Sequence, residues 1–198
     1  MAQSHETGLR LPAVHFTPSG TAQEIPDFRV TEFDINIMQR AVDLAAIALD
    51  GGDYPVGAVI VDEYGETFEG FANEFLTSRL YGHAEANAIN RYNERTKRRS
   101  LEGTVMYVTQ EPCVGCSAYI DQGKLSLLHQ STTREKCNEA TMKEHGINVV
   151  RQRDLGLPNV LKDSPRQLTV VTGLLAANSI DLFLIKAGII KLTEPNKR

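Results

Sequence analysis

Hydrophobic positions with helical spacing alternate along this chain with short apolar runs that are typical of strands. From Asp34 to Leu49, apolar residues recur every three or four positions, which predicts one amphipathic helix. Thr31 or Asp34 can cap the start of this helix, and Gly51-Gly52 is expected to end it. Further helices are predicted over residues 83–92, 113–120, 133–145 and 178–187.

The apolar runs between these helices predict a sheet. The run from Val56 to Val61 is apolar on both faces, so it is expected to be a central strand, and Tyr64-Gly65 marks a turn into a returning strand. Strands are predicted over residues 56–61, 67–72, 105–108, 125–128 and 168–171, with 147–150 as a further candidate. Because strands and helices alternate, we expect an α/β fold: a three-layer α/β/α sandwich around a five-stranded mixed, partly parallel sheet.

The predicted elements do not cover the chain evenly. Residues 1–30 show neither period and contain several prolines, so we expect an N-terminal arm that is extended or disordered. An arm that lies across a partner subunit is the alternative. Residues 31–198 are long enough for a single domain with a buried core. Near 147–167, prolines among mixed polar residues predict an inserted loop.

Composition indicates the cellular compartment of the protein and the classes of partner that it can bind. The net charge of −4 argues against a protein that coats nucleic acid or an anionic membrane, because such binding relies on basic surfaces. No apolar run reaches the roughly 18 residues of a membrane span, and the start does not resemble a secretory signal. Three cysteines, two of them in a C-x-x-C pair, favour metal or redox chemistry in a reducing cytoplasm over a disulfide framework.

One basic cluster, Lys97-Arg98-Arg99, leaves two interpretations open. It can be a solvated loop, or it can contact phosphate or RNA. Because the chain as a whole is acidic and has one such cluster, a small substrate is favoured over nucleic acid, which stays an alternative.

The candidate chemistry lies in two stretches, His83-Ala84-Glu85 and Pro112-Cys113-Val114-Gly115-Cys116. A histidine nitrogen and two cysteine thiolates are zinc ligands, and three protein ligands leave a fourth position open for a water molecule, as in catalytic sites. Cys113 and Cys116 lie on one face of a predicted helix start, where the helix dipole favours thiolate. His83 starts another predicted helix, so both helices can point their N-termini at one metal ion.

Glu85 gives this predicted zinc site a function. Zinc lowers the pKa of bound water to about 7, far below that of free water. A carboxylate two residues from a ligand can reach that water without displacing it, accept its proton and deliver the proton to a substrate. Alternatively, Glu85 is a surface residue that pairs with an arginine, an interpretation that its position beside a ligand disfavours.

Three other interpretations concern the cysteines and the remaining histidines. Cys137 could complete a structural four-ligand zinc site, although it lies in a separate predicted helix. The C-x-x-C pair could be a redox pair, but a redox pair has no need of the His-x-Glu sequence. His129 and His145 are more simply explained as surface or core residues.

The two stretches together resemble the zinc-dependent nucleobase and nucleoside deaminases of the cytidine/deoxycytidylate deaminase superfamily. That family carries H-x-E followed by P-C-x-x-C, and here 26 residues separate Glu85 from Pro112. The segments around 55–61, 71–74 and 107–113 are also similar to the family, and the resemblance extends over about 34–130. It implies that His83, Cys113 and Cys116 bind Zn²⁺ and that Glu85 is the catalytic proton shuttle.

The resemblance implies further roles. Asn73 would hydrogen-bond the base or sugar, although a turn asparagine would look the same, and the Ala84 backbone N–H would meet a ring carbonyl. The implied reaction is hydrolytic: water replaces an amino group on a ring carbon and ammonia leaves. Family members usually form homodimers or tetramers, so a homodimer is expected.

The substrate is the least determined part of the prediction. The predicted helix between the last two strands resembles the branch of guanine deaminases and tRNA adenosine deaminases, and the segment 168–187 resembles the end of purine-base deaminases. An aminopurine such as guanine is therefore the expected substrate class. The alternatives are a nucleic-acid deaminase, a cytosine- or cytidine-type deaminase, and a non-catalytic zinc module that binds a partner.

Overall fold

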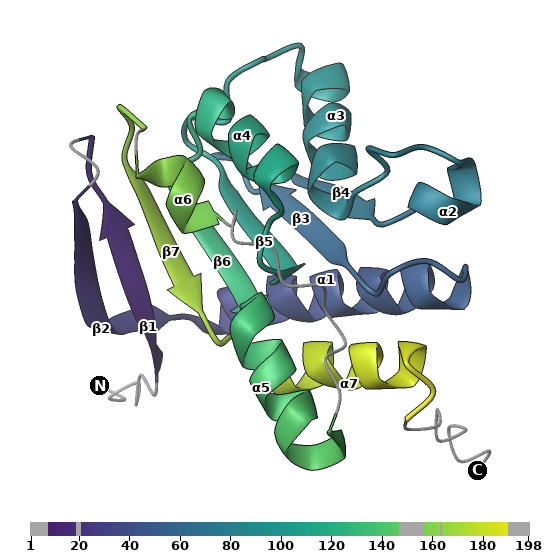
Figure 1. Cartoon of the computed structure of the whole chain (residues 1–198). Helices are drawn as coiled ribbons and strands as arrows, with labels where there is room; N and C mark the ends of the chain where they lie inside the picture. Colours follow the sequence, from purple (N-terminus) through teal and green to yellow (C-terminus); the bar gives the residue numbers. More distant parts are fainter. Residues whose placement is uncertain (1–7, 19–20, 147–156, 163, 190–198) are drawn as a thin grey trace, which may run out of the picture.

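A seven-stranded mixed sheet lies at the centre of the computed structural model, which describes residues 8–18, 21–146, 157–162 and 164–189 (Figure 1). The strand order is β2-β1-β7-β6-β5-β3-β4. The strands are β1 (Leu9–Phe16), β2 (Ala22–Val30), β3 (Gly57–Val61), β4 (Thr67–Phe71), β5 (Val105–Gln110), β6 (Leu127–Thr132) and β7 (Leu168–Thr172). The helices are α1 (Glu32–Asp50), α2 (Glu74–Thr77), α3 (Ala84–Thr96), α4 (Val114–Gly123), α5 (Arg134–His145), α6 (Leu157–Leu161) and α7 (Ala176–Lys186).

The pairing of the strands confirms a mixed, partly parallel sheet. Strands β5, β6 and β7 are parallel neighbours. Strand β3 pairs antiparallel with β4 and β5, so it lies inside the sheet, as its wholly apolar sequence predicts. At the other side, β1 pairs antiparallel with both β2 and β7.

Helices cover both faces of the sheet, which confirms the predicted three layers. Helices α3, α4 and α6 pack on one face, and α1 packs with α7 on the other (Figure 1). The first core includes Phe68, Tyr92, Met106 and Ile120. The second core is formed chiefly by α1 against β3 and β5.

Helix α1 forms where its apolar spacing predicts and has a defined start. Thr31 is its N-cap: the Asp34 N–H donates to Thr31 Oγ1 at 3.3 Å, and the Thr31 N–H donates to Asp34 Oδ2 at 2.8 Å. The helix also lies very close to β3. A methyl group on Gly57 would lie 2.0 Å from the carbonyl oxygen of Ala41, so only glycine allows this approach.

Two of the seven strands come from the segment for which the sequence predicted an arm, so the prediction of five strands is wrong. Residues 9–16 and 22–30 are indeed extended, but as a hairpin that joins the sheet beside β7. Val30 is fully buried and Ala13 is nearly so. Pro26 lies in an edge strand, opposite an irregularity between Leu11 and Ala13, where a proline costs no ladder hydrogen bond.

Other boundaries differ by a few residues. Helix α3 continues four residues beyond the predicted end, and β6 begins at Leu127, two residues later than predicted. Pro112 lies just before the N-cap of α4 and not in its first turn.

The sequence predicts an inserted loop near 147–167. Residues 147–156, with the candidate strand at 147–150, lie outside the described residues. The described part that follows contains α6, whose Leu157 and Leu161 are buried in the core beneath α4. Ser164 donates a hydrogen bond to Asp121 Oδ1 and so ties the segment to α4.

Among the described residues, no helix is both long and apolar enough to cross a membrane.

Candidate active site

Two helix N-termini converge on one point at the same face of the sheet. His83 is the N-cap of α3, and Cys113 is the N-cap of α4. Strand β5 leads directly into α4, and β3 lies between β5 and β4, the strand that precedes the α3 region. Both helix dipoles therefore present their positive ends to this point, which favours the thiolate forms of nearby cysteines.

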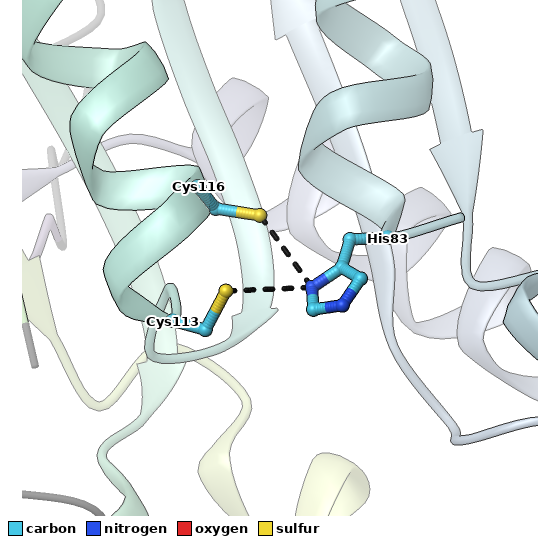
Figure 2. A group of neighbouring side chains, drawn as sticks. All are labelled: His83, Cys113 and Cys116. Carbon is cyan, nitrogen blue, oxygen red and sulfur yellow. Dashed lines mark hydrogen bonds between the residues drawn. The ribbon is translucent and has the colours of Figure 1, made fainter. Parts of the chain in front are cut away.

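The three predicted ligands lie at distances that suit zinc. His83 Nδ1 lies 3.5 Å from Cys113 Sγ and 3.6 Å from Cys116 Sγ, and all three ligand atoms fall within 4.8 Å of one another (Figure 2). A tetrahedral zinc ion with ordinary Zn–S and Zn–N bonds separates a sulfur ligand from a nitrogen ligand by about 3.6 Å. The donor set and its spacing therefore fit a zinc ion held by one nitrogen and two sulfurs.

The protonation of these groups follows from their contacts. Two hydrogen bonds lower the pKa of Cys113 to about 3: the one from Cys116 has the larger effect, and the one with His83 adds to it. The hydrogen bond with Cys113 in turn raises the pKa of His83 to about 9. The same cysteine pair and burial raise the pKa of Cys116. These contacts favour the thiolate form of Cys113, which is the form that binds zinc.

Glu85 is buried beside this cluster. Glu85 is only 3% exposed, and its carboxyl group interacts with the Cys116 thiol. Burial raises the pKa of Glu85, and the neighbouring Cys113 adds to this effect. A carboxyl group that can hold or release a proton therefore lies next to the metal ligands without belonging to the ligand cluster.

Glu74, which the sequence analysis did not single out, lies on the other side of His83. Its Oε2 is 3.7 Å from His83 Nε2, the ring nitrogen that faces away from the two sulfurs. A carboxylate at this position orients a metal-binding histidine and selects its tautomer. No sequence motif indicates it, because the approach depends on how the short helix α2 folds back toward α3.

Asn73 lies close to the cluster, and a second missed residue orients its side chain. The Asn73 N–H donates to the Gly82 carbonyl oxygen at 2.8 Å, directly before His83. Asn87 Nδ2 donates to Asn73 Oδ1 at 3.1 Å and to the Phe71 carbonyl oxygen at 2.9 Å. Asn87 stands four residues after His83 on the same helix face, and this spacing is the signal that could have identified it.

The Asn87 contact leaves the Asn73 amide nitrogen available to donate to a ligand. In the described part of the chain, Asn73 Nδ2 has no hydrogen-bond partner. Ala84 is the first residue of α3, where backbone N–H groups have no intrahelical acceptor. Two hydrogen-bond donors therefore flank His83.

Residues considered as alternative ligands lie elsewhere. Cys137 is buried in α5 and is not part of the ligand cluster. His129 is a core residue, 1% exposed, stacked on Tyr107. Within the residues that the structure describes, no second group of three potential ligands is as close together.

The basic cluster at 97–99 is partly neutralised by acidic neighbours. Arg98 Nη1 lies 2.5 Å from Glu63 Oε1, and Arg95 nearby forms an ion pair with Glu66. These contacts favour the interpretation as a solvated, ion-paired surface.

The fold and the site together define an α/β protein with a three-ligand metal centre and an adjacent buried carboxyl group. Residues 31–128 match the family model described as the cytidine and deoxycytidylate deaminase zinc-binding region. The chain belongs to this family of deaminases, whose cofactor is zinc. The match includes all the residues of the cluster.

The individual relatives of this chain are named for different deaminase substrates. A tRNA-specific adenosine deaminase of Rickettsia felis is 35% identical over 102 residues, which cover 50% of this chain and 70% of the relative. A probable cytosine deaminase of Schizosaccharomyces pombe is 31% identical over 91 residues, covering 46% of this chain and 55% of the relative. A guanine deaminase structure from Bacillus subtilis is 28% identical, with a TM-score of 0.50, and covers 53% of this chain and 68% of the other.

Proposed function

We propose that this protein is a zinc-dependent hydrolytic deaminase of a free nucleobase or nucleoside, with an aminopurine such as guanine as the preferred class. The observation that carries the proposal is the position of Glu85, buried against Cys116 beside three ligands with zinc spacing. A partner-binding zinc module would have no use for a carboxyl group buried there, since such burial is costly.

Each residue of the site has a part in the proposed reaction. His83, Cys113 and Cys116 hold the zinc ion, which when bound supplies a water molecule with a pKa near 7. Glu85 accepts one proton from the attacking water and passes it to a ring nitrogen, and it then carries the second proton, from the newly added hydroxyl group, to the departing amino group. The net change is an amino-heterocycle plus water to an oxo-heterocycle plus ammonia.

Asn73 and Ala84 orient the substrate in this proposal. The Asn73 amide, fixed by Asn87, donates from Nδ2 to the base or sugar, and the Ala84 N–H donates to a ring carbonyl. Pre-oriented donors of this kind hold the reacting carbon in one place and so lower the entropic part of the barrier.

Surface charge supports a small substrate over nucleic acid. The chain carries a net charge of −4, Arg98 of its basic cluster pairs with Glu63, and the nearby Arg95 pairs with Glu66. A nucleic-acid editor needs basic surface that remains available to phosphates. A nucleic-acid substrate is still the second candidate, because the Rickettsia felis relative is named for tRNA.

An ammonia-release screen tests the proposal. The zinc-loaded protein is offered guanine, adenine and cytosine, their nucleosides and an adenosine-containing tRNA anticodon stem-loop. The Glu85→Gln variant should keep its zinc but lose activity by about 10²–10⁴-fold or more. Glu102→Gln is the matched control and should keep full activity, because Glu102 is an exposed residue in the loop between α3 and β5.

Three outcomes would each direct the conclusion elsewhere. Full activity of Glu85→Gln would refute the proton-transfer role. Turnover of the stem-loop alone, weakening steeply with salt, would favour the nucleic-acid candidate. No ammonia from any substrate would favour a non-catalytic zinc module.

A homodimer and a cytoplasmic location remain predictions, and equilibrium ultracentrifugation checks the first.

A further inference from the structure

A buried carboxylate outside the metal cluster organises the segment that leads to His83. Asp53 is 1% exposed and lies in the loop between α1 and β3. Its Oδ2 accepts hydrogen bonds from the Phe75 N–H at 2.7 Å and, more weakly, from the Leu76 N–H at 3.4 Å, and its Oδ1 accepts from the Tyr54 N–H at 2.9 Å. One carboxylate thus ties the loop before β3 to helix α2, whose Phe75 is 22 residues away in the chain.

These hydrogen bonds place two aromatic rings side by side at the surface. The rings of Tyr54 and Phe75 have centroids 5.6 Å apart and are tilted by 48°. Tyr54 is 46% exposed and Phe75 is 61% exposed. A fixed aromatic pair that faces water is costly unless something covers it, because the rings would otherwise gain free energy by burial.

The aromatic pair belongs to the neighbourhood of the metal ligands. Phe75 directly follows Glu74, whose carboxylate approaches His83, and it stands two residues after Asn73. Helix α2, which contains Phe75, lies beside the end of α3 at which His83 stands (Figure 1). Polar groups for hydrogen bonding and an apolar surface for a ring therefore come from one short segment.

We infer that Tyr54 and Phe75 form an apolar wall of the substrate site that favours a bicyclic over a monocyclic heterocycle, with Asp53 as the residue that positions it. This inference rests on the proposed function. Sites for planar heterocycles combine aromatic surface with a few oriented polar groups, as the pair and Asn73 do here. A purine covers more of the two rings than a pyrimidine does, so the pair contributes to selecting the larger base.

Variants of exposed residues test the wall without threatening the fold. In Phe75→Leu and Tyr54→Leu, KM for the best bicyclic substrate should rise by about ten- to a hundred-fold, the worth of one stacked base contact, with kcat nearly unchanged. The double variant should lose less than the product of the two effects, because both rings contact one substrate face. Tyr64→Leu, at an 84% exposed tyrosine in the β3–β4 turn, is the control and should change nothing.

A binding measurement separates this inference from the proposed function. Hypoxanthine and uracil carry no amino group to lose, so their dissociation constants can be measured by calorimetry on zinc-loaded protein. The wild type should bind hypoxanthine more tightly than uracil, and Phe75→Leu should reduce that preference. If the wild type released no ammonia but kept this preference, the proposed reaction would fail and the wall would stand.

Asp53→Asn tests the positioning role. One end of an amide donates instead of accepting, so a backbone N–H loses its acceptor. We expect the same rise in KM and the same loss of preference for hypoxanthine as in Phe75→Leu, with kcat and zinc content close to wild type. Unchanged binding and KM in the aromatic variants would overturn the inference. So would a change of molecular mass without any change in binding, which would make this surface a contact between copies of the chain.

Discussion

A methyl group on Gly70 would lie 2.1 Å from the carbonyl oxygen of Ala84, the residue between His83 and Glu85. The bare backbone of β4 at this position lets the first turn of α3 rest directly on the sheet. The heights of His83 and Glu85 above β4 therefore depend on the absence of one side chain.

Gly70→Ala should push the start of α3 away from β4. The added carbon has no flexible neighbour to displace, since its nearest contacts are the backbone atoms of Ala84 and Ala88. We expect a loss of about 1–3 kcal/mol in the free energy of unfolding, as for overpacked cores. Zinc affinity should fall as well, because His83 moves with the helix. Denaturant unfolding and zinc titration against a chromophoric chelator measure the two effects.

Gly115→Ala is the matched control for this change. Gly115 also lies beside the metal ligands, but a methyl group there would come no closer than 3.9 Å to Cys113 Sγ. Alanine is also the better helix former, so this variant should bind zinc and unfold like the wild type or slightly better. Equal zinc affinity in Gly70→Ala and the wild type would show that the contact with Ala84 does not set the site.

The sequence was sufficient for the parts of this protein that depend on local pattern. Helical spacing predicted α1, and Thr31, one of its two candidate caps, is the N-cap. The two motifs identified His83, Cys113 and Cys116, whose ligand atoms the fold brings within 4.8 Å of one another. Local pattern failed in the hairpin β1–β2, because each strand contains a proline, the spacing of their apolar residues is irregular, and the neighbouring strand β7 lies far away in the sequence.

Contacts that form only through tertiary folding could not be predicted from the sequence either. Asp53 reaches Phe75 across 22 residues, and Glu74 approaches His83 only because a short helix folds back between them. Nothing in the spacing of these residues distinguishes them from ordinary surface carboxylates.

Glu74→Gln should weaken zinc binding. The Glu74 carboxylate lies 3.7 Å from His83 Nε2, and a neutral amide would hold and polarise the imidazole less well. Loss of such an outer partner typically lowers metal affinity by about 10–100-fold. Chelator competition on the purified protein measures the affinity without any substrate. Glu66→Gln removes an exposed carboxylate that pairs with Arg95, and it should leave zinc affinity unchanged.

His129 makes the stability of the fold depend on pH. Its ring stacks on Tyr107 with centroids 4.8 Å apart, and its Nε2 lies 3.8 Å from Asp34 Oδ1. Burial lowers the pKa of His129 below its ordinary value of 6.5, although the Asp34 carboxylate opposes the shift. The folded state thus keeps this histidine neutral while the unfolded chain accepts a proton. The contribution of His129 to stability is complete above about pH 6.5 and is lost as the pH falls below that value.

His129→Phe should flatten this dependence. Phenylalanine keeps an aromatic ring against Tyr107 but has no proton to gain, so the difference from the wild type in free energy of unfolding should grow in favour of the variant between pH 7.5 and 5.5. The slope for one proton approaches about 1.4 kcal/mol per pH unit. Urea unfolding at several pH values measures it, and His145→Asn, at an exposed histidine, should keep the wild-type slope. Parallel curves for His129→Phe and the wild type would contradict the assignment.

Gln110→Leu should make the protein more stable. Gln110 ends β5 on the face that also carries Met106 and Val108, and it is 5% exposed. Neither atom of its side-chain amide has a hydrogen-bond partner among the described residues. A buried polar group without a partner costs about 1–3 kcal/mol, and leucine of similar size removes that cost.

Gln130→Leu is the comparison that isolates this effect. Gln130 is equally buried on β6, but its Nε2 donates to Thr172 Oγ1 at 3.0 Å. Leucine there would break a hydrogen bond and leave the Thr172 hydroxyl without it, so this variant should gain less or lose stability. Thermal and urea unfolding of both variants give the two free energies. If Gln110→Leu instead lost stability, the Gln110 amide would have a bound water as its partner in solution. If the variant kept its stability and zinc but lost affinity for hypoxanthine, the partner of the amide would be the substrate.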